Sequence, residues 1–538
     1  MSLNIDGVEK STYRVFDFKG GLNKIYTNTA LADNEATNLV DVDFTTRGAI
    51  KQRAGLNLTA DFRLPKPQAL LSFRFTEKGD VIAQHEVINL TGGSTSEFRV
   101  GSYKPIIKTR TRIKHEDDGN GNPVEDTFEY TPYTNTFTND PVSFFSHSGK
   151  IFFVHPQNGG FMFDGTVENN TYVIYHIPTI PKGRFALVKN QRVFITGNPD
   201  NPNFVYFSVV GDPENFDISV DLGGDVVTTT GAGGLIRTED DDTYITGIAE
   251  FNSRLIIFKT NYIYSVTGVD AEDDRLEPLN VASGCIDGYS IAKSDNQLFY
   301  LANDGVRAIR NVQDTVVESI PLSDKIFPRK MGSAGNGQWR VVAMTQGSRY
   351  FISGLSFDGT YVFDEILGAW TFYSCSYRSV AYYPQQDIMC MGGDDGNIRY
   401  FLEGRLNDEI KSGVFQAIPA TYSSPLLTLG EPEVTKRFRS LKVFYKPNPV
   451  KDSKIDVKIE VDYKENWKNL PSSYTAFEWD SELWDEASWD VDKEEISGSV
   501  RFSGTGNTVR VSFTNDKLDE ALSIHGYVLI YKRKRKVR

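Results

Sequence analysis

The chain has 538 residues and a formal net charge of −13, with 39% hydrophobic and 24% charged residues. Its length exceeds the size at which one hydrophobic core stops growing, so two or three domains are expected, and its 35 Phe and 26 Tyr favour strands. The acidic net charge argues against general adhesion to nucleic acid, and three Cys are too few and too widely spaced for a disulfide scaffold. The chain has neither a signal-like start nor a long apolar run, which predicts a soluble protein made in the cytoplasm.

The first 60 residues are predicted to form an N-terminal arm and the first strands. Asp33 is a favourable N-cap residue, and Glu35 falls where a carboxylate complements the positive end of a helix dipole. A short helix is therefore expected over residues 34–40, within an otherwise extended segment.

Residues 61–411 are predicted to form a β-propeller. Short units recur in which an apolar strand, a polar turn and a second apolar strand are followed by a turn containing Gly or Asp. Such units fit four-stranded propeller blades, which repeat about every 40–50 residues. The central strands begin near residues 151, 193, 255, 298, 350 and 388, which predicts six or seven irregular blades.

Two polar, Gly-rich stretches interrupt this region, at 113–135 and 221–242. The first is expected to be an exposed loop or hairpin tip, and the second an inserted loop. A long polar loop of this kind can move aside at modest cost.

Residues 412–538 are predicted to form a C-terminal β-sandwich with a basic tail. Their strands alternate apolar and polar side chains, which is typical of antiparallel sheets with one buried face. The tail at 532–538 (KRKRKVR) is interpreted as a solvated end; the alternatives are contact with DNA phosphates or with an acidic neighbour in a ring.

Three tryptophans, Trp479, Trp484 and Trp489, recur every five residues among carboxylates. A period of five fits neither a helix face nor a strand face. Two interpretations remain open. The tryptophans pack on the sandwich from an irregular loop, or they form an intersubunit contact, where aromatic anchors are enriched.

Three segments of the chain carry short motifs. The first segment has motifs at 20–23 (GGLN), 33–36 (DNEA), 43–44 (DF), 47–48 (RG) and 53–55 (RAG). The second has motifs at 203–208 (NFVYFS) and 211–216 (GDPENF), and the third is the C-terminal sandwich with its last apolar strand at 525–531. Together these segments resemble the tail nozzle, tail hub or packaged-DNA-stabilisation proteins of podoviruses, the short-tailed bacteriophages.

This resemblance implies a structural virion protein without enzymatic activity. It implies a homohexameric ring below the adaptor of the portal vertex, with tail fibre or spike proteins as further neighbours. The propellers would surround a channel, retain the packaged genome and allow its ejection, and the DNA would pass without sequence-specific binding. Either of the loops at 113–135 and 221–242 is then a candidate for narrowing the channel. The candidate channel-loop residues are Asp117, Asp118, Asn120 and Asn122. The acidic composition of the body adds the hypothesis that the channel surface is acidic or neutral, because dense Lys and Arg would hold a polyanion back.

The residues themselves suggest no catalytic constellation, cofactor or metal site. The six histidines are scattered, and neither a nucleophile motif nor a phosphate-binding loop is present. Residues 115–123 (HEDDGNGNP) superficially suggest a calcium loop, but an exposed acidic turn is the preferred interpretation. The alternative function is a host-surface-binding or glycan-degrading propeller, and an enzyme of that kind would need paired carboxylates in a pocket.

Overall fold

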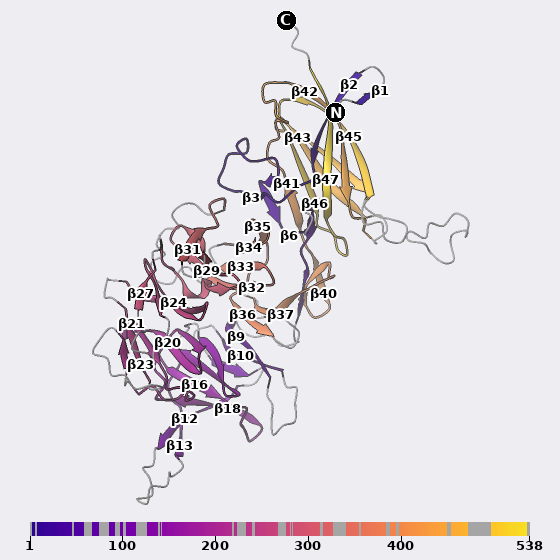
Figure 1. Cartoon of the computed structure of the whole chain (residues 1–538). Helices are drawn as coiled ribbons and strands as arrows, with labels where there is room; N and C mark the ends of the chain where they lie inside the picture. The colour runs from indigo at the N-terminus through magenta and orange to yellow at the C-terminus, as the bar shows by residue number, and fades with distance from the viewer. Residues whose placement is uncertain are drawn as a thin grey trace, which may run out of the picture.

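The molecule consists of a β-propeller and a β-sandwich joined by the N-terminal segment (Figure 1). Within the described part of the chain the only helical element is one 3-10 turn, Gly288–Ser290, and no helix there could span a membrane. The computed structural model describes residues 3–5, 8–45, 48–58, 67–74, 85–91, 97–100, 104–113, 126–137, 140, 142–217, 220–222, 233–238, 243–266, 276–279, 281, 283–312, 316–326, 341–354, 357–383, 388–393, 397–448, 453–471 and 496–534.

The described residues form seven antiparallel sheets that are the blades of the propeller, which confirms the predicted fold class. The first three are β9 (Pro67–Arg74), β10 (His85–Thr91) and β11 (Glu97–Val100); β14 (Ser143–His147), β15 (Lys150–His155), β16 (Gly159–Phe163) and β18 (Thr171–Ile177); and β19 (Phe185–Lys189), β20 (Arg192–Asn198), β21 (Asn201–Phe207), β23 (Gly234–Arg237) and the parallel β22 (Val220–Leu222).

The next two blades are β24 (Ile245–Phe251), β25 (Arg254–Lys259), β26 (Ile263–Val266) and β27 (Leu276–Pro278); and β28 (Ala292–Lys293), β29 (Gln297–Ala302), β30 (Gly305–Val312) and β31 (Val316–Pro321). The last two are β32 (Val341–Gln346), β33 (Arg349–Gly354), β34 (Gly359–Asp364) and β35 (Ala369–Tyr373); and β36 (Ser379–Tyr383), β37 (Ile388–Gly392), β38 (Ile398–Leu402) and β8 (Gly55–Leu58).

The central strands of the blades are continuous apolar runs. In β15, β25, β29 and β33 every residue after the first is buried. A strand is apolar on both faces when both faces are covered, and here the neighbouring blades cover them. The tight turn before β20 uses Asn190 and Gln191, both at positive φ (49° and 60°), which matches the right-handed twist of hairpin strands.

One blade is completed by the N-terminal segment. Strand β8 pairs antiparallel with β38, from Gly55 opposite Leu402 to Leu58 opposite Arg399. The outer strand of the last blade therefore comes from the residues that immediately precede the first blade. This pairing holds the two ends of the propeller segment in one sheet.

The sandwich has two sheets. One contains β1 (Leu3–Ile5), β2 (Val8–Val15), β47 (Ser523–Arg533), β42 (Lys436–Tyr445) and β45 (Ile496–Gly506), with β6 (Val42–Phe44) and β7 (Ile50–Gln52) at the side. The other contains β5 (Asn38–Val40), β41 (Ala420–Ser423), β46 (Val509–Asn515), β43 (Lys454–Val461) and β44 (Lys464–Pro471), and it continues through β5 into the propeller blade β32–β35.

The predicted helix over residues 34–40 is wrong. The segment forms β4 (Glu35–Ala36), which pairs with β3 (Gly21–Leu22), and β5, which lies between β35 and β41. A single helical turn gains few hydrogen bonds and is costly to nucleate, whereas β5 finds backbone partners in both domains. Tertiary pairing therefore overrides the local capping signal of Asp33.

The predicted loop at 221–242 is also partly wrong, because Gly234–Arg237 is strand β23 of the third blade. Its Leu235 and Ile236 are buried against the blade core, and a short apolar pair after a Gly-rich run gave no periodic signal. In the stretch at 113–135, β12 (Ile106–Ile113) pairs antiparallel with β13 (Thr127–Pro132) as a hairpin that extends from the propeller (Figure 1).

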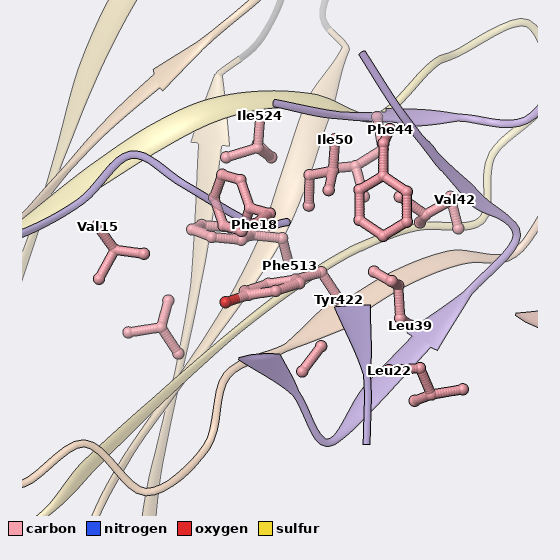
Figure 2. Close-up of a cluster of buried hydrophobic side chains, with 14 of the residues drawn as sticks. Val15, Phe18, Leu22, Leu39, Val42, Phe44, Ile50, Tyr422, Phe513 and Ile524 are labelled. Atoms are coloured by element: carbon pink, nitrogen blue, oxygen red, sulfur yellow. The ribbon is translucent and has the colours of Figure 1, made fainter. Parts of the chain in front are cut away.

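The largest hydrophobic cluster joins the arm, the propeller and the sandwich. Figure 2 shows arm residues Phe18, Leu39 and Phe44 among sandwich residues that include Tyr422 and Phe513. The rings of Phe18 and Tyr422 meet edge to face with centroids 5.0 Å apart, and Phe18 is 1% exposed. The arm is therefore a shared part of the core rather than a peripheral extension.

Candidate functional site

The residues predicted as sites lie outside the described residues. These are Trp479, Trp484 and Trp489, which fall in 472–495, and Asp117, Asp118, Asn120 and Asn122, which fall in 114–125. The intersubunit contact and the channel loop therefore remain predictions. What the structure does bring together is a set of motif residues from the N-terminal segment, among them Asp43 and Arg53.

Arg53 lies at the centre of the junction between arm, propeller and sandwich. Its Nε donates to Asp41 Oδ1 at 2.6 Å, and its two terminal nitrogens donate to the carboxylate of Asp408 at 2.8 and 2.6 Å. The side chains of Arg53 and Asp41 are 1% and 0% exposed. A buried guanidinium of this kind is held by paired carboxylates in a fixed, forked geometry.

The same two carboxylates also bind the chain around them. Asp41 accepts hydrogen bonds from the backbone N–H and the hydroxyl of Ser374, just after β35. Asp408 accepts from the backbone N–H of Leu56 in β8. Asp408 belongs to β39 (Asn407–Lys411), which forms a hairpin with β40 (Val414–Ala417). The network thus ties the arm to the last two blades and to the segment that leads into the sandwich.

A second buried carboxylate, Asp43, holds the arm against blade β32–β35. Arg349 Nη1 donates to Asp43 at 3.0 Å, and the hydroxyl of Tyr373 donates to the same carboxylate. Burial alone would lower the pKa of Arg349, but the charge and hydrogen bond of Asp43, together with the nearby Tyr373 and Asp364, raise that pKa above its usual value. The backbone of Val42 accepts from Thr371 at 2.6 Å, so the attachment uses main chain as well.

The motifs at 20–23 and 33–36 lie beside this network and are joined by hydrogen bonds and an ion pair. Glu35 accepts from Asn23 at 3.2 Å and from the backbone N–H of Ala32 at 2.9 Å, and it pairs with Lys325 of the propeller at 2.7 Å. Gly21 has φ of 68°, and a Cβ there would lie 2.9 Å from the backbone nitrogen of Trp370. Only glycine fits this backbone approach without strain.

The motif at 211–216 clamps the β12–β13 hairpin. Arg112 pairs with Asp212 at 2.7 Å, and Arg110 pairs with Glu214, both of whose side chains are close to one-tenth exposed. The hydroxyl of Thr179 donates to the carbonyl of Glu214 at 2.6 Å. The loop after β21 therefore holds the outer part of this hairpin, whose strand β12 pairs parallel with β18 of the previous blade through Ile106–Thr109.

Sequence reasoning singled out Asp43 and Arg53 only through the resemblance, and it missed Asp41, Asp408 and Arg349. Asp41 lies between β5 and β6 at a positive φ of 54°, and Asp43 lies in β6, so two carboxylates fall within an apolar and buried segment. Asp408 lies 355 residues from its partner Arg53. No local signal could reveal that pair, because only the tertiary fold brings the two residues together.

The charged groups described above are paired with one another, so the arrangement positions domains. Burial raises the pKa of Cys285 and of Cys375 to about 12 and that of Cys390 to about 11, which leaves these thiols unreactive. Among the described residues, no group of three or more His, Cys, Asp or Glu could hold a metal ion. Two hollows on the surface are open and shallow, with volumes of about 290 and 320 Å³.

No family model and no curated protein sequence matches the chain. Among solved structures it is similar to PorZ, an essential bacterial surface component of the type-IX secretion system of Porphyromonas gingivalis, at 11% identity and a TM-score of 0.36 over 71% of this chain and 44% of PorZ. The chain thus spans less than half of PorZ.

Two further similar structures are propellers. One is the Cps50 (Swd1) β-propeller domain of Myceliophteria thermophila, at 13% identity and a TM-score of 0.34 over 64% of this chain and 99% of that domain. The other is the WD40 repeats of RRP9, at 7% identity and a TM-score of 0.37 over 65% of this chain and 98% of that one.

Proposed function

We propose that this chain is a structural subunit of the tail nozzle or hub of a short-tailed bacteriophage. In this proposal it forms a homohexameric ring in the virion, binds the adaptor of the portal vertex and the tail fibre or spike proteins, and surrounds the channel through which genomic DNA is retained and ejected. The observation that carries the proposal is the convergence of the podovirus-like motif residues of the N-terminal segment, Asp43, Arg53 and Gly21, on one buried junction.

This convergence supports a mechanical role. Two domains of one chain move relative to each other by default unless their interface is large and apolar or otherwise locked. Here the hydrophobic cluster crosses the junction, and the paired charges of Arg53, Asp41 and Asp408 lie within it. A ring subunit that contacts an adaptor with one domain and lines a channel with another needs such a fixed angle between its domains.

The charge of the chain supports passage of DNA without capture. Six of the last seven residues are basic, so the remaining residues carry an even larger negative charge than the total of −13. An acidic or neutral lumen does not bind phosphates strongly, and DNA can slide through it. Retention of the genome would then come from steric narrowing rather than from ionic contacts.

The proposal is tested by the mass and shape of the purified protein, alone and with the portal–adaptor complex. A closed ring of six copies around a central channel is the expected result, because cyclic closure satisfies identical head-to-tail interfaces. A protein that stays monomeric with the adaptor complex present, or that is found in particles only at fibre tips, contradicts the proposal.

A further inference from the structure

The outer face of the second sandwich sheet carries a shallow polar hollow of about 290 Å³. It crosses the five strands β5, β41, β46, β43 and β44, whose opposite face packs into the core through Tyr422, Phe513, Val457 and Ile459. The lining residues that matter are Trp467, Lys458, Glu460, Arg510, Ser512 and Ser423.

Strand register makes this hollow one continuous surface. Ser512 lies opposite both Ser423 and Lys458, Lys458 lies opposite Trp467, and Glu460 lies opposite Arg510. Directly opposite residues on one face of a sheet have Cβ atoms about 4.5–5.5 Å apart, so these side chains act on the same ligand-sized area. The floor consists of short hydroxyl side chains, and the larger side chains stand around it.

Trp467 is the unusual member of this surface, because it is 61% exposed whereas Trp370 of the propeller is 2% exposed. Its indole Nε1 donates to Glu465 at 3.2 Å, and Lys458 Nζ lies 5.4 Å from the ring centroid. The neighbouring charges therefore hold the ring in place at the edge of the hollow while most of it remains in solvent. An exposed, oriented indole beside hydroxyl groups offers an apolar platform next to hydrogen-bonding groups.

The charges around the hollow cancel. Lys458 pairs with Glu465 at 2.5 Å, and Arg510 pairs with Glu460 at 3.6 Å. A phosphate or a polyanion gains little from such a surface, whereas a neutral ligand rich in hydroxyls does not need net charge.

We propose that this hollow binds a neutral saccharide. One face of a pyranose ring packs on Trp467. The sugar hydroxyls exchange hydrogen bonds with Ser423 and Ser512, and with Lys458 and Glu460, each of which also has its own ion-pair partner. The site belongs to the sandwich alone, so it stands whether or not the chain forms a tail ring, and it adds recognition of a surface glycan to a structural role. No bond is made or broken.

Saturation-transfer NMR on the full chain tests this inference. The probes are glucose, galactose, mannose, N-acetylglucosamine and their common disaccharides, because the method detects weak binding, in the range of about 1 mM, through the ligand signals. The wild-type chain is expected to transfer saturation to at least one of these sugars. Trp467→Ala and Ser512→Val are each expected to weaken that binding about tenfold or more, the first by removing the platform and the second by filling the floor.

Tyr463→Ala is the matched control, because Tyr463 is 75% exposed on the turn next to Trp467 and is not part of the lining. It should bind sugar as the wild type does. The inference is overturned if no probe receives saturation from the wild-type chain, or if Trp467→Ala binds as tightly as the wild type. It is equally overturned if Trp467→Ala abolishes self-association while sugar binding is never seen, because the face is then a contact between copies.

Discussion

Arg53 Nε lies 2.6 Å from Asp41 Oδ1, and neither side chain has appreciable contact with solvent. Both residues belong to the N-terminal segment, yet each is bonded onward to a different part of the molecule, Asp41 to Ser374 after blade β32–β35 and Arg53 to Asp408 in β39. Removing Arg53 would leave Asp41 buried without a counter-charge, and removing Asp41 would leave Arg53 with Asp408 alone. The pair therefore makes the attachment of the two domains cooperative.

Arg53→Met should destabilise the protein by about 3–5 kcal/mol, because it leaves Asp41 and Asp408 without their shared cation. The measurement is the urea midpoint followed by fluorescence. Lys51→Met is the matched control, since Lys51 is partly exposed and 3.9 Å from the mostly exposed Glu403, and it should change stability by less than about 1 kcal/mol. Equal midpoints for Arg53→Met and Lys51→Met would rule out the locking role of the network.

Phe18→Ala should cost about 3–5 kcal/mol, the usual range for truncating a fully buried aromatic side chain. Phe18 contacts the rings of both Tyr422 and Tyr527, so its loss opens a cavity between the arm and the sandwich. Ile25→Ala, at a side chain that is 43% exposed, should be nearly neutral. Thermal unfolding compares the two, and a small effect of Phe18→Ala would mean that the arm does not contribute to the core.

Asp287 gives a prediction with a definite sign. Burial of its carboxyl raises the pKa of Asp287 from 3.8 to about 7. The hydrogen bond that the carboxyl accepts from the N–H of Tyr289 lowers the pKa, but by less than burial raises it. Between about pH 4 and 7 the folded chain keeps a proton that the unfolded chain releases, so this group makes stability fall as pH rises. Asp287 is the N-cap of the 3-10 turn Gly288–Ser290, and Asp287→Asn keeps a side-chain oxygen that can accept this hydrogen bond while it removes the titration.

The variant Asp287→Asn should therefore melt at the same temperature as the wild type near pH 4 and at a higher temperature at pH 8. At pH 8 its free energy of unfolding should exceed that of the wild type by about 2–4 kcal/mol. Melting curves of both proteins across this range are the measurement. A constant offset at all pH values would show that Asp287 keeps an ordinary pKa in the folded chain.

Much of the fold was accessible from the sequence, because propeller strands such as β15 and β29 are apolar runs and sandwich strands such as β43 alternate. The strand β5 within the segment 34–40 could not be predicted, because its hydrogen-bond partners β35 and β41 lie far away in the sequence. The junction was accessible only through isolated motif residues. Its closing partner, Asp408, lies in a stretch with no signal of its own, and its role depends on long-range folding.

Glu214→Gln should loosen the β12–β13 hairpin, because Arg110 then loses a charge-assisted partner in a site with little solvent. The expected local cost is about 1–3 kcal/mol, seen as faster hydrogen exchange in Ile106–Ile113. The matched control is Asp200→Asn, which removes the exposed Lys182–Asp200 pair and should leave exchange unchanged. Unaltered exchange in Glu214→Gln would mean that the clamp is not needed to hold the hairpin.

A map of the mature phage particle at side-chain resolution tests the central claim most directly. The account predicts six copies of this chain in a ring around the tail channel, with a lumen lined by acidic and neutral side chains and with Trp479, Trp484 and Trp489 at the contact between neighbouring copies. A lumen lined by Lys and Arg would contradict the sliding of DNA. A particle in which the chain forms no ring around the channel would contradict the proposed function itself.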